Sequence, residues 1–285
     1  MKSPAFDYAR PTTLAEAVSL LTAHGGAAKV LAGGQSLVPM LAFRLAEPTL
    51  LVDLNRVSEL RYIKIEDDGV RLGAMVRWRQ IEDDVRLASA HPLLVAALKH
   101  VAHYQIRNRG TIGGSLAHAD PAAELPGIAV TCEAEITAIG ATGRRVLGAA
   151  DFFLGALTTA LKPEEIIVEL HLPPWPVQRR WGFEEFSRRR GDFALAAAAL
   201  YYDTLPDGKA RNSHVGVIGV ADRPQRLTQV EAMLDGRLID GDTIAQVERA
   251  AAAAVHPGDD IHASAAYRRA LVGTMVGRAL KRAAT

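Results

Sequence analysis

The sequence is poor in cysteine, in long apolar runs and in net charge. Cys132 is the only cysteine in 285 residues, so neither an internal disulfide nor a cysteine-ligated iron–sulfur cluster can form within the chain. No apolar run approaches the ~20 residues of a membrane span, and the first residues lack the apolar core of a signal peptide. The formal net charge of +1 gives no indication of nucleic-acid or membrane-surface binding. These absences predict a cytoplasmic protein.

The overall composition is that of an ordinary globular protein. Hydrophobic residues make up 49% of the chain and charged residues 23%, which allows a sizeable core without disulfides. At roughly 100–200 residues per domain, the length predicts two domains, or three lobes.

The first 56 residues have the pattern of a small α/β lobe. Thr13 and Glu16 form a capping box, apolar residues follow at helical spacing, and residues 24–26 (His-Gly-Gly) end the helix. Two apolar strands are predicted next, over 28–32 and 49–54. The order helix, strand, loop, strand predicts an α/β arrangement.

The sequence pattern of residues 57–175 predicts a second lobe made of hairpins and helices. The predicted segments are a hairpin over 63–72, a helix over 93–101, a helix with Asp120 as N-cap and Pro121 at its first position, a hairpin over 135–147 and a strand over 166–172. Three prolines within 173–176 favour an extended connector. This connector predicts a domain boundary after residue 175.

Residues 176–285, beyond this connector, are predicted to form a C-terminal domain. A strand is expected over 215–220, and helical spacing of apolar residues predicts a helix over 264–283. The segment 194–202 is ambiguous, because its alanines favour a helix whereas the turn sequence at 205–208 favours a hairpin. We interpret the segment as a strand.

Two glycine elements are the most informative local feature. The first glycine element is Ala32-Gly33-Gly34-Gln35-Ser36, which leads into Leu37; the second is Thr111-Ile112-Gly113-Gly114-Ser115. Glycine permits positive φ and close approach of the backbone to a ligand. Consecutive N–H groups can then hold an anion, supplemented by a nearby hydroxyl. A diphosphate has two phosphates, and each element is suited to one of them.

Each glycine element alone is also consistent with an ordinary turn. Neither matches the dinucleotide pattern GxGxxG or the phosphate-loop pattern GxxxxGK[ST], so nothing predicts a Rossmann domain. Two elements of the same chemistry, each after a strand- or turn-like segment, favour phosphate binding.

A third candidate region runs from His118 to Pro126 and contains Asp120 and Glu124. This combination of side chains raises the question of a metal site. Capping accounts for Asp120, however, and a zinc site would need a further ligand from elsewhere in the chain. We therefore expect no metal here, and instead contact with a ligand seated on the second glycine element.

The remaining candidates carry less information. Ser36 and Ser115 are possible nucleophiles, but neither lies in a GxSxG elbow. Cys132 lies in an apolar stretch and is expected to be a buried, inert thiol. The run 188–190 (Arg-Arg-Arg) has the pattern of a solvated surface, with docking of a partner or neutralisation of a phosphate as the alternative. Phe193 is more typical of a core residue than of a ring-stacking one.

At this point the motifs resemble a known family, the FAD-binding medium subunits of molybdenum hydroxylases. The similarity is greatest to aerobic carbon monoxide dehydrogenases, and it extends more distantly to the flavin domain of xanthine dehydrogenases. It covers essentially the whole chain. The matching segments are 8–11, 32–39, 109–115, 118–126, 151–155, 161–165 and 186–189.

The resemblance implies an α+β fold, with FAD held between two α/β sub-lobes of the PCMH type, not the Rossmann type. It implies an FAD-binding domain over 1–175, with sub-lobes of about 1–56 and 57–175, and a smaller C-terminal domain of antiparallel sheet and helices over 176–285. The diphosphate of non-covalent FAD would lie on the two glycine elements. His118, Asp120 and Glu124 would lie near the ribityl and adenosine groups. Phe193 would lie near the isoalloxazine ring, where it lacks the hydroxyl of the tyrosine that the family often has.

The resemblance also implies a relay function without catalytic residues in this chain. A large subunit with a molybdenum cofactor would oxidise the substrate. Electrons would pass through two [2Fe-2S] clusters on a small subunit to the FAD, and then to an external acceptor, a quinone or NAD. The expected assembly is a heterohexamer, a dimer of heterotrimers. Two alternatives remain open: a stand-alone FAD-dependent oxidase, and a scaffold subunit that has lost FAD.

Overall fold

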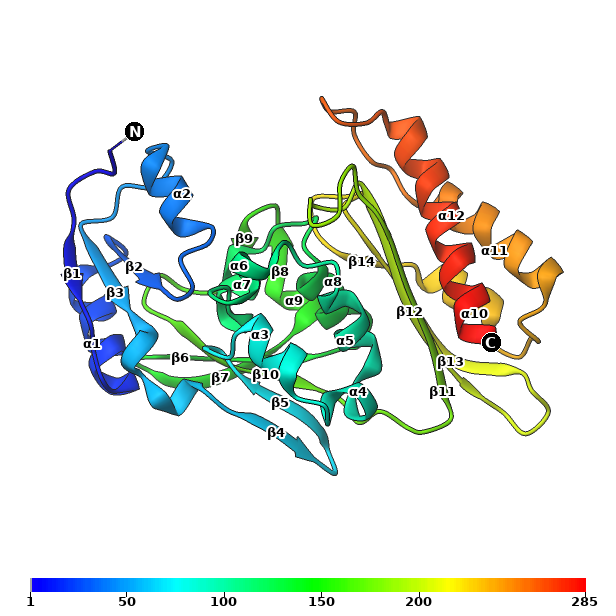
Figure 1. The fold of residues 1–285 in the computed structure, drawn as a ribbon, viewed down its shortest axis with the longest axis horizontal. Helices are drawn as coiled ribbons and strands as arrows, with labels where there is room; N and C mark the ends of the chain where they lie inside the picture. Colours follow the sequence, from blue (N-terminus) through cyan, green and yellow to red (C-terminus); the bar gives the residue numbers. More distant parts are fainter. Residues whose placement is uncertain (1) are drawn as a thin grey trace.

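The computed structural model describes residues 2–285 and contains three main sheets that follow one another along the chain (Figure 1). The N-terminal sheet lies at one end of the molecule, and the C-terminal sheet with its helices lies at the other (Figure 1). Among the described residues, no helix is both long and apolar enough to cross a bilayer. The mixed α+β class expected from the sequence is confirmed.

The N-terminal lobe is built on a parallel sheet of order β1-β3-β2. The helix predicted after Thr13 is confirmed, because the Thr13 hydroxyl accepts a hydrogen bond from the Glu16 amide and Gly25 ends the helix with φ of +52°. The elements are β1 (Asp7–Ala9), α1 (Leu14–His24), β2 (Ala28–Leu31), α2 (Leu37–Ala42), β3 (Leu50–Asp53), and the 3-10 turns η1 (Leu54–Arg56) and η2 (Ser58–Leu60).

The second lobe is an antiparallel sheet of order β4-β5-β10-β6-β7, with helices over it (Figure 1). Its strands are β4 (Ile63–Glu66), β5 (Gly69–Gly73), β6 (Glu135–Gly140), β7 (Gly143–Gly148) and β10 (Ile166–Leu172), and a separate ribbon pairs β8 (Phe153–Gly155) with β9 (Thr158–Thr159). Its helices are α3 (Trp78–Asp83), α4 (Leu87–Ala90), α5 (Pro92–Leu98), α6 (Tyr104–Arg107), α7 (Ile112–His118), α8 (Glu124–Thr131) and α9 (Ala149–Phe152). Both predicted hairpins and the predicted strand over 166–172 are confirmed.

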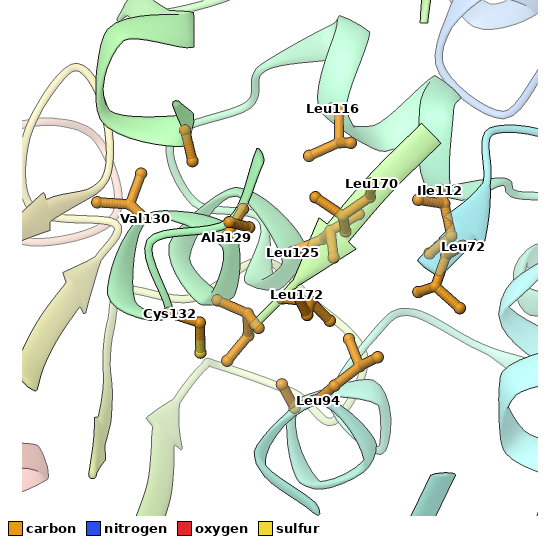
Figure 2. Packing of buried hydrophobic residues seen from close by; sticks show 14 of the residues in the cluster. Leu72, Leu94, Ile112, Leu116, Leu125, Ala129, Val130, Cys132, Leu170 and Leu172 are labelled. Carbon is orange, nitrogen blue, oxygen red and sulfur yellow. The ribbon is translucent and has the colours of Figure 1, made fainter. Parts of the chain in front are cut away.

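Helix α8 lies at the centre of the molecule, and all of its residues are buried. Leu125 and Ala129 belong to a core shared with β5, β10 and α5 (Figure 2). On another side, two glycines allow close contact with β13: a Cβ on Gly127 would lie 2.3 Å from the Ile218 side chain, and one on Gly216 would lie 1.8 Å from the Thr131 hydroxyl. The central helix therefore couples the second lobe to the C-terminal sheet.

The C-terminal region contains an antiparallel sheet of order β11-β12-β13-β14 and three helices. The predicted helix over 264–283 is confirmed as α12, with Ser264 as N-cap. The elements are β11 (Arg179–Phe186), β12 (Ala196–Thr204), β13 (Ala210–Ile218), β14 (Gln225–Arg226), α10 (Thr228–Leu234), α11 (Gly241–Ala254) and α12 (Ala265–Ala284).

The ambiguous alanine-rich segment forms strand β12, as we interpreted it. Its residues alternate between two cores. Ala197, Ala199 and Tyr201 face the core around α8, whereas Ala196 and Ala198 face the core beneath α12. A strand covered on both faces is continuously apolar, and alanine lets both layers approach closely. Burial on both faces thus overrides the helical propensity of alanine.

Two local predictions are wrong. No helix starts at Asp120, because that residue caps a turn: its Oδ1 accepts from Ala122 N at 2.9 Å and its carbonyl accepts from Ala123 N. The turn is held by a bond from Gly219 N to the Pro121 carbonyl, and α8 begins only at Glu124. The second glycine element is not a loop either. It is the first part of helix α7, because Thr111 acts as an N-cap.

Candidate functional site

The first glycine element lies at the carboxyl edge of the parallel sheet, between the end of β2 and the start of α2. Ligands of α/β folds bind outside the carboxyl ends of parallel strands. Gly34 has φ of +73°, a conformation that costs a residue with a Cβ about 1–2 kcal/mol. Glycine at position 34 is therefore required for the backbone bend of the first glycine element.

The first glycine element presents a row of free amide groups. Within residues 2–285, none of the five backbone N–H groups from Gly33 to Leu37 donates a hydrogen bond. The Ser36 hydroxyl also has no partner among the described residues, whereas the Gln35 side chain turns back to the Gly33 carbonyl at 3.0 Å. Unpaired amides that follow one another in a turn are an anion-binding arrangement.

A side-chain clamp fixes the start of this element. Asn55 donates from Nδ2 to the Ala32 carbonyl at 3.0 Å and to Asp53 Oδ1 at 2.6 Å. Asp53 also accepts hydrogen bonds from Asn55 N and from the Tyr8 hydroxyl. Burial opposes ionisation of Asp53, but these hydrogen bonds outweigh it and lower its pKa. The ionised carboxylate therefore orients Asn55, and Asn55 holds the element in place.

The second glycine element uses most of its amides within the protein. Ile112 N donates to the Val76 carbonyl and Gly113 N to the Ala74 carbonyl, at 2.9 and 2.8 Å. Gly114 N lies 3.2 Å from the Thr111 hydroxyl. The Ser115 hydroxyl makes no hydrogen bond in the described part of the chain. This element therefore offers hydroxyl groups and the start of α7, rather than a second row of free amides.

The two glycine elements meet in space. A Cβ on Gly33 would lie 2.2 Å from the Arg109 carbonyl oxygen and 2.9 Å from Gly110 Cα. A Cβ on Gly114 would lie 3.7 Å from the Ala32 side chain. Segments from the two lobes thus pack backbone to backbone. We refer to residues 32–37 and 111–115 together as the glycine cradle.

The donors of the glycine cradle suit a diphosphate. Phosphate oxygens accept hydrogen bonds from amides and hydroxyls, and the cradle supplies five free N–H groups together with the hydroxyls of Ser36 and Ser115. Glycine backbone lets such a ligand approach closely. The residues present therefore fit the diphosphate of a dinucleotide such as FAD.

The segment between α7 and α8 carries the next three predicted residues. His118 ends α7 and is half-buried, Ala119 has φ of +51°, and Asp120 caps the following turn. These residues continue directly from the cradle along the chain. The Asp120 carboxylate is thus already engaged, because it accepts a hydrogen bond from the Ala122 amide. Glu124 lies one turn further on, at the start of α8.

Glu124 is a buried carboxyl group. It is 6% exposed, and burial, followed by repulsion from Glu185, raises its pKa to about 8. At neutral pH the group is therefore a neutral carboxylic acid that can donate a hydrogen bond. Sequence reasoning did not identify Glu185, whose side chain is 1% exposed and whose Oε2 has no hydrogen-bond partner. Its position on β11 becomes significant only through tertiary packing.

Phe193 lies on the loop between β11 and β12 and is 59% exposed, so it is not a core residue. The same loop is anchored at Gly191, where a Cβ would lie 2.6 Å from the His103 ring. The three arginines at 188–190 are also exposed on this loop. The exposed ring of Phe193 is therefore available to a flat ligand or to a partner protein.

Other candidates from the sequence are unreactive or scattered. Cys132 is buried, and burial raises its pKa to about 12, so the thiol is inert, as predicted. Among residues 2–285, no three His, Cys, Asp or Glu side chains are grouped to hold a metal ion.

Comparison with known proteins assigns the chain to a family. Residues 4–175 match the model of the FAD-binding domain in molybdopterin dehydrogenase, and residues 181–283 match the C-terminal domain of the CO dehydrogenase flavoprotein. The first match defines the class, an FAD-binding flavoprotein. The chain belongs to the family of FAD-binding medium subunits of molybdopterin-dependent dehydrogenases, which includes the CO dehydrogenase medium chains.

Individual relatives agree with this assignment over nearly their full length. The chain is 38% identical to the 6-hydroxypseudooxynicotine dehydrogenase complex subunit alpha of Paenarthrobacter nicotinovorans, over 99% of this chain and 96% of that protein. It is 36% identical to the CO dehydrogenase medium chain of Hydrogenophaga pseudoflava, over 99% and 98%. The crystal structure of quinoline 2-oxidoreductase from Pseudomonas putida 86 superposes with a TM-score of 0.95 at 38% identity, over 100% and 98%. The family, the oxidoreductase class and the FAD cofactor inferred from the sequence are confirmed.

Proposed function

We propose that this chain passes electrons, through an FAD held on the glycine cradle, from an iron–sulfur subunit to an external acceptor, a quinone or NAD. The observation that carries the proposal is the row of five unpaired amides at 33–37, facing a second glycine element from another lobe. Bound FAD would supply the electron chemistry, and the chain would supply position and electrostatics.

Different residues of the chain would bind different parts of the cofactor. The amides of 33–37 and the hydroxyls of Ser36, Thr111 and Ser115 would bind the diphosphate. His118, Asp120 and the neutral carboxyl of Glu124 would lie along the ribityl and adenosine groups. Phe193 would lie against the isoalloxazine ring, where it can exclude water but cannot donate a hydrogen bond.

The full assembly that we propose is a dimer of heterotrimers in the cytoplasm. A small subunit would carry the [2Fe-2S] clusters and a large subunit the molybdenum cofactor, because this chain has a single, buried cysteine and its sequence shows no acid–base constellation. Curated relatives are subunits of complexes, which supports the division. Within the chain, we propose that the FAD-binding domain ends at residue 175 and that the C-terminal domain spans 176–285.

Two measurements test the assembly and the cofactor. Purification from the native host should yield both partner subunits and a flavin absorbance spectrum, and denaturation should release the flavin from the polypeptide. Purification of the chain alone, without a molybdenum- or cluster-bearing partner, would contradict the relay function. Flavin that stays attached after denaturation would contradict non-covalent binding.

A pair of substitutions tests the location of FAD. Gly33→Glu and Gly114→Glu would each place a carboxylate within the glycine cradle, where it repels phosphate, and should abolish FAD binding. Gly241→Glu is the matched control, because a Cβ there meets nothing within 4 Å and the position lies on α11. Unchanged FAD content in both cradle variants would show that the diphosphate lies elsewhere.

A further inference from the structure

A polar cleft opens beside the glycine cradle, at the carboxyl edge of the parallel sheet. Its volume is about 630 Å³, within the range of roughly 300–1,000 Å³ typical of small-molecule sites. We call it the arginine cleft, because five arginines and one carboxylate line it: Arg10, Arg61, Arg77, Arg79, Arg109 and Asp53.

Three of these arginines lack a counter-ion. Arg10 pairs with Asp53, and Arg79 pairs with two acidic residues on its own helix. In residues 2–285, no carboxylate lies within ion-pair distance of Arg61, Arg77 or Arg109. Arg61 bonds only to the carbonyl groups of Asn55, at 3.1 and 3.2 Å.

Two of the unpaired side chains, Arg61 and Arg77, are partly buried, whereas Arg109 is exposed. Arg77 Nε is buried and has no hydrogen-bond partner. The pKa of Arg61 is lowered by burial and, next, by repulsion from Arg77. Crowding like charges away from water is unfavourable, and an anion bound between them would relieve it. The convergence of these side chains therefore points to an anionic ligand.

The FAD does not account for this ligand. FAD carries one diphosphate, and the glycine cradle has the donors for it. None of the residues that line the arginine cleft belongs to the glycine cradle. In this respect the inference rests on the proposed function, since it places the FAD diphosphate on the cradle.

We propose that the arginine cleft binds the phosphate groups of a second nucleotide, distinct from the FAD. Arginine binds phosphate oxygens through two parallel hydrogen bonds, and three unpaired arginines suit a diphosphate. Tyr8, at the rim, is 53% exposed and offers a ring on which a base can stack. The exposed ring beside clustered guanidinium groups matches a ligand that has both a flat base and phosphates, which is a nucleotide.

Binding of ADP to the complete complex, loaded with FAD, tests the proposal. In titration calorimetry ADP should bind, inorganic pyrophosphate should compete with it, uncharged adenosine should bind far more weakly, and salt should weaken ADP binding. Arg61→Gln and Arg77→Gln should each weaken ADP binding about tenfold or more, since a charged hydrogen bond is lost. Arg249→Gln, an exposed arginine on α11, is the control and should leave ADP binding unchanged.

The measurements test the cleft proposal independently of the proposal that the FAD diphosphate lies on the glycine cradle. Flavin content, read from absorbance, should be the same in wild type and in Arg77→Gln, because Arg77 makes no hydrogen bond to the Asn55 clamp of the glycine cradle. Loss of flavin in Arg77→Gln would overturn the proposal, because the cleft would then hold part of the FAD. Failure of ADP to bind the wild-type complex would also overturn it, including the case in which an acidic partner surface fills the cleft. If ADP binds as expected but Gly33→Glu and Gly114→Glu leave the flavin content unchanged, the cleft proposal would be supported and the placement of the FAD diphosphate on the cradle would be refuted.

Discussion

Gly33 packs directly against the backbone of Arg109, so closely that a Cβ at position 33 would lie 2.2 Å from the Arg109 carbonyl oxygen. This contact joins the N-terminal lobe to the second lobe at the point where both glycine elements face the proposed diphosphate. A backbone neighbour cannot move as a flexible side chain can. The spacing between the two lobes at the cradle therefore depends on the absence of a side chain at position 33.

The Gly33–Arg109 contact predicts the effect of Gly33→Ala. The added methyl group should push the lobes apart at the cradle and weaken FAD binding about tenfold or more, which corresponds to about 1.4 kcal/mol. The measurement is the dissociation constant of FAD from the purified complex. Gly241→Ala, where a Cβ meets nothing within 4 Å, should bind FAD like the wild type, and equal affinity in Gly33→Ala would show that the lobes have room.

Gly34→Ala tests the bend of the first glycine element. The φ of Gly34 is +73°, a conformation that should cost alanine about 1–2 kcal/mol. Relief of this strain should change the bend, so that the free amides no longer point in a common direction. Gly236 has a φ of +79° and open space around it, so Gly236→Ala carries the same backbone strain away from the cradle. Both variants should unfold at a lower temperature, but only Gly34→Ala should lose flavin. Loss of flavin in both would indicate a general effect of instability.

Glu124→Gln tests the buried carboxylic acid. Because its pKa in the folded protein is raised from 4.5 to about 8, the folded state holds one proton more than the unfolded state between these values. The free energy of unfolding should therefore fall as pH rises through this window, by up to roughly 1.4 kcal/mol per pH unit. Glutamine, which is always neutral, should flatten the dependence. Denaturant unfolding across this pH range measures it.

The control for this experiment is Glu47→Gln, an exposed glutamate that should keep the wild-type pH dependence. An identical pH profile in wild type and Glu124→Gln would mean that the carboxyl group is ionised in the folded protein. The proposal that a neutral carboxyl of Glu124 lies beside the cofactor would then be untenable.

Gly182→Ala tests how closely α12 packs on the C-terminal sheet. A Cβ on Gly182 would lie 2.0 Å from the Ala279 carbonyl oxygen, so the helix would have to move away from β11. Overpacking of this kind typically costs about 1–3 kcal/mol. Thermal unfolding should show a lower midpoint for Gly182→Ala than for Gly258→Ala, where a Cβ has open space. Equal midpoints would mean that α12 shifts freely.

Local sequence signals were sufficient for several of the regular elements. Thr13 and Gly25 delimit α1 because capping depends only on neighbours in the chain. The alternation in 63–72 and 166–172 likewise gave strands β4, β5 and β10. The signal failed at Asp120, where a bond from the distant Gly219 amide to Pro121 favours a turn over a helix start.

The sequence by itself determined the two glycine elements, the single unreactive thiol of Cys132 in its apolar stretch, and the division into successive α/β and antiparallel patterns, because each depends on residues close together in the chain. Only the tertiary structure decided that Gly33 meets Gly110, that burial and then repulsion from Glu185 raise the pKa of Glu124, and that Arg61, Arg77 and Arg109 share one cleft. These relationships join residues from different lobes or elements. They are set by how buried surfaces pack against one another, and the spacing of residues along the chain does not encode that packing in any local pattern.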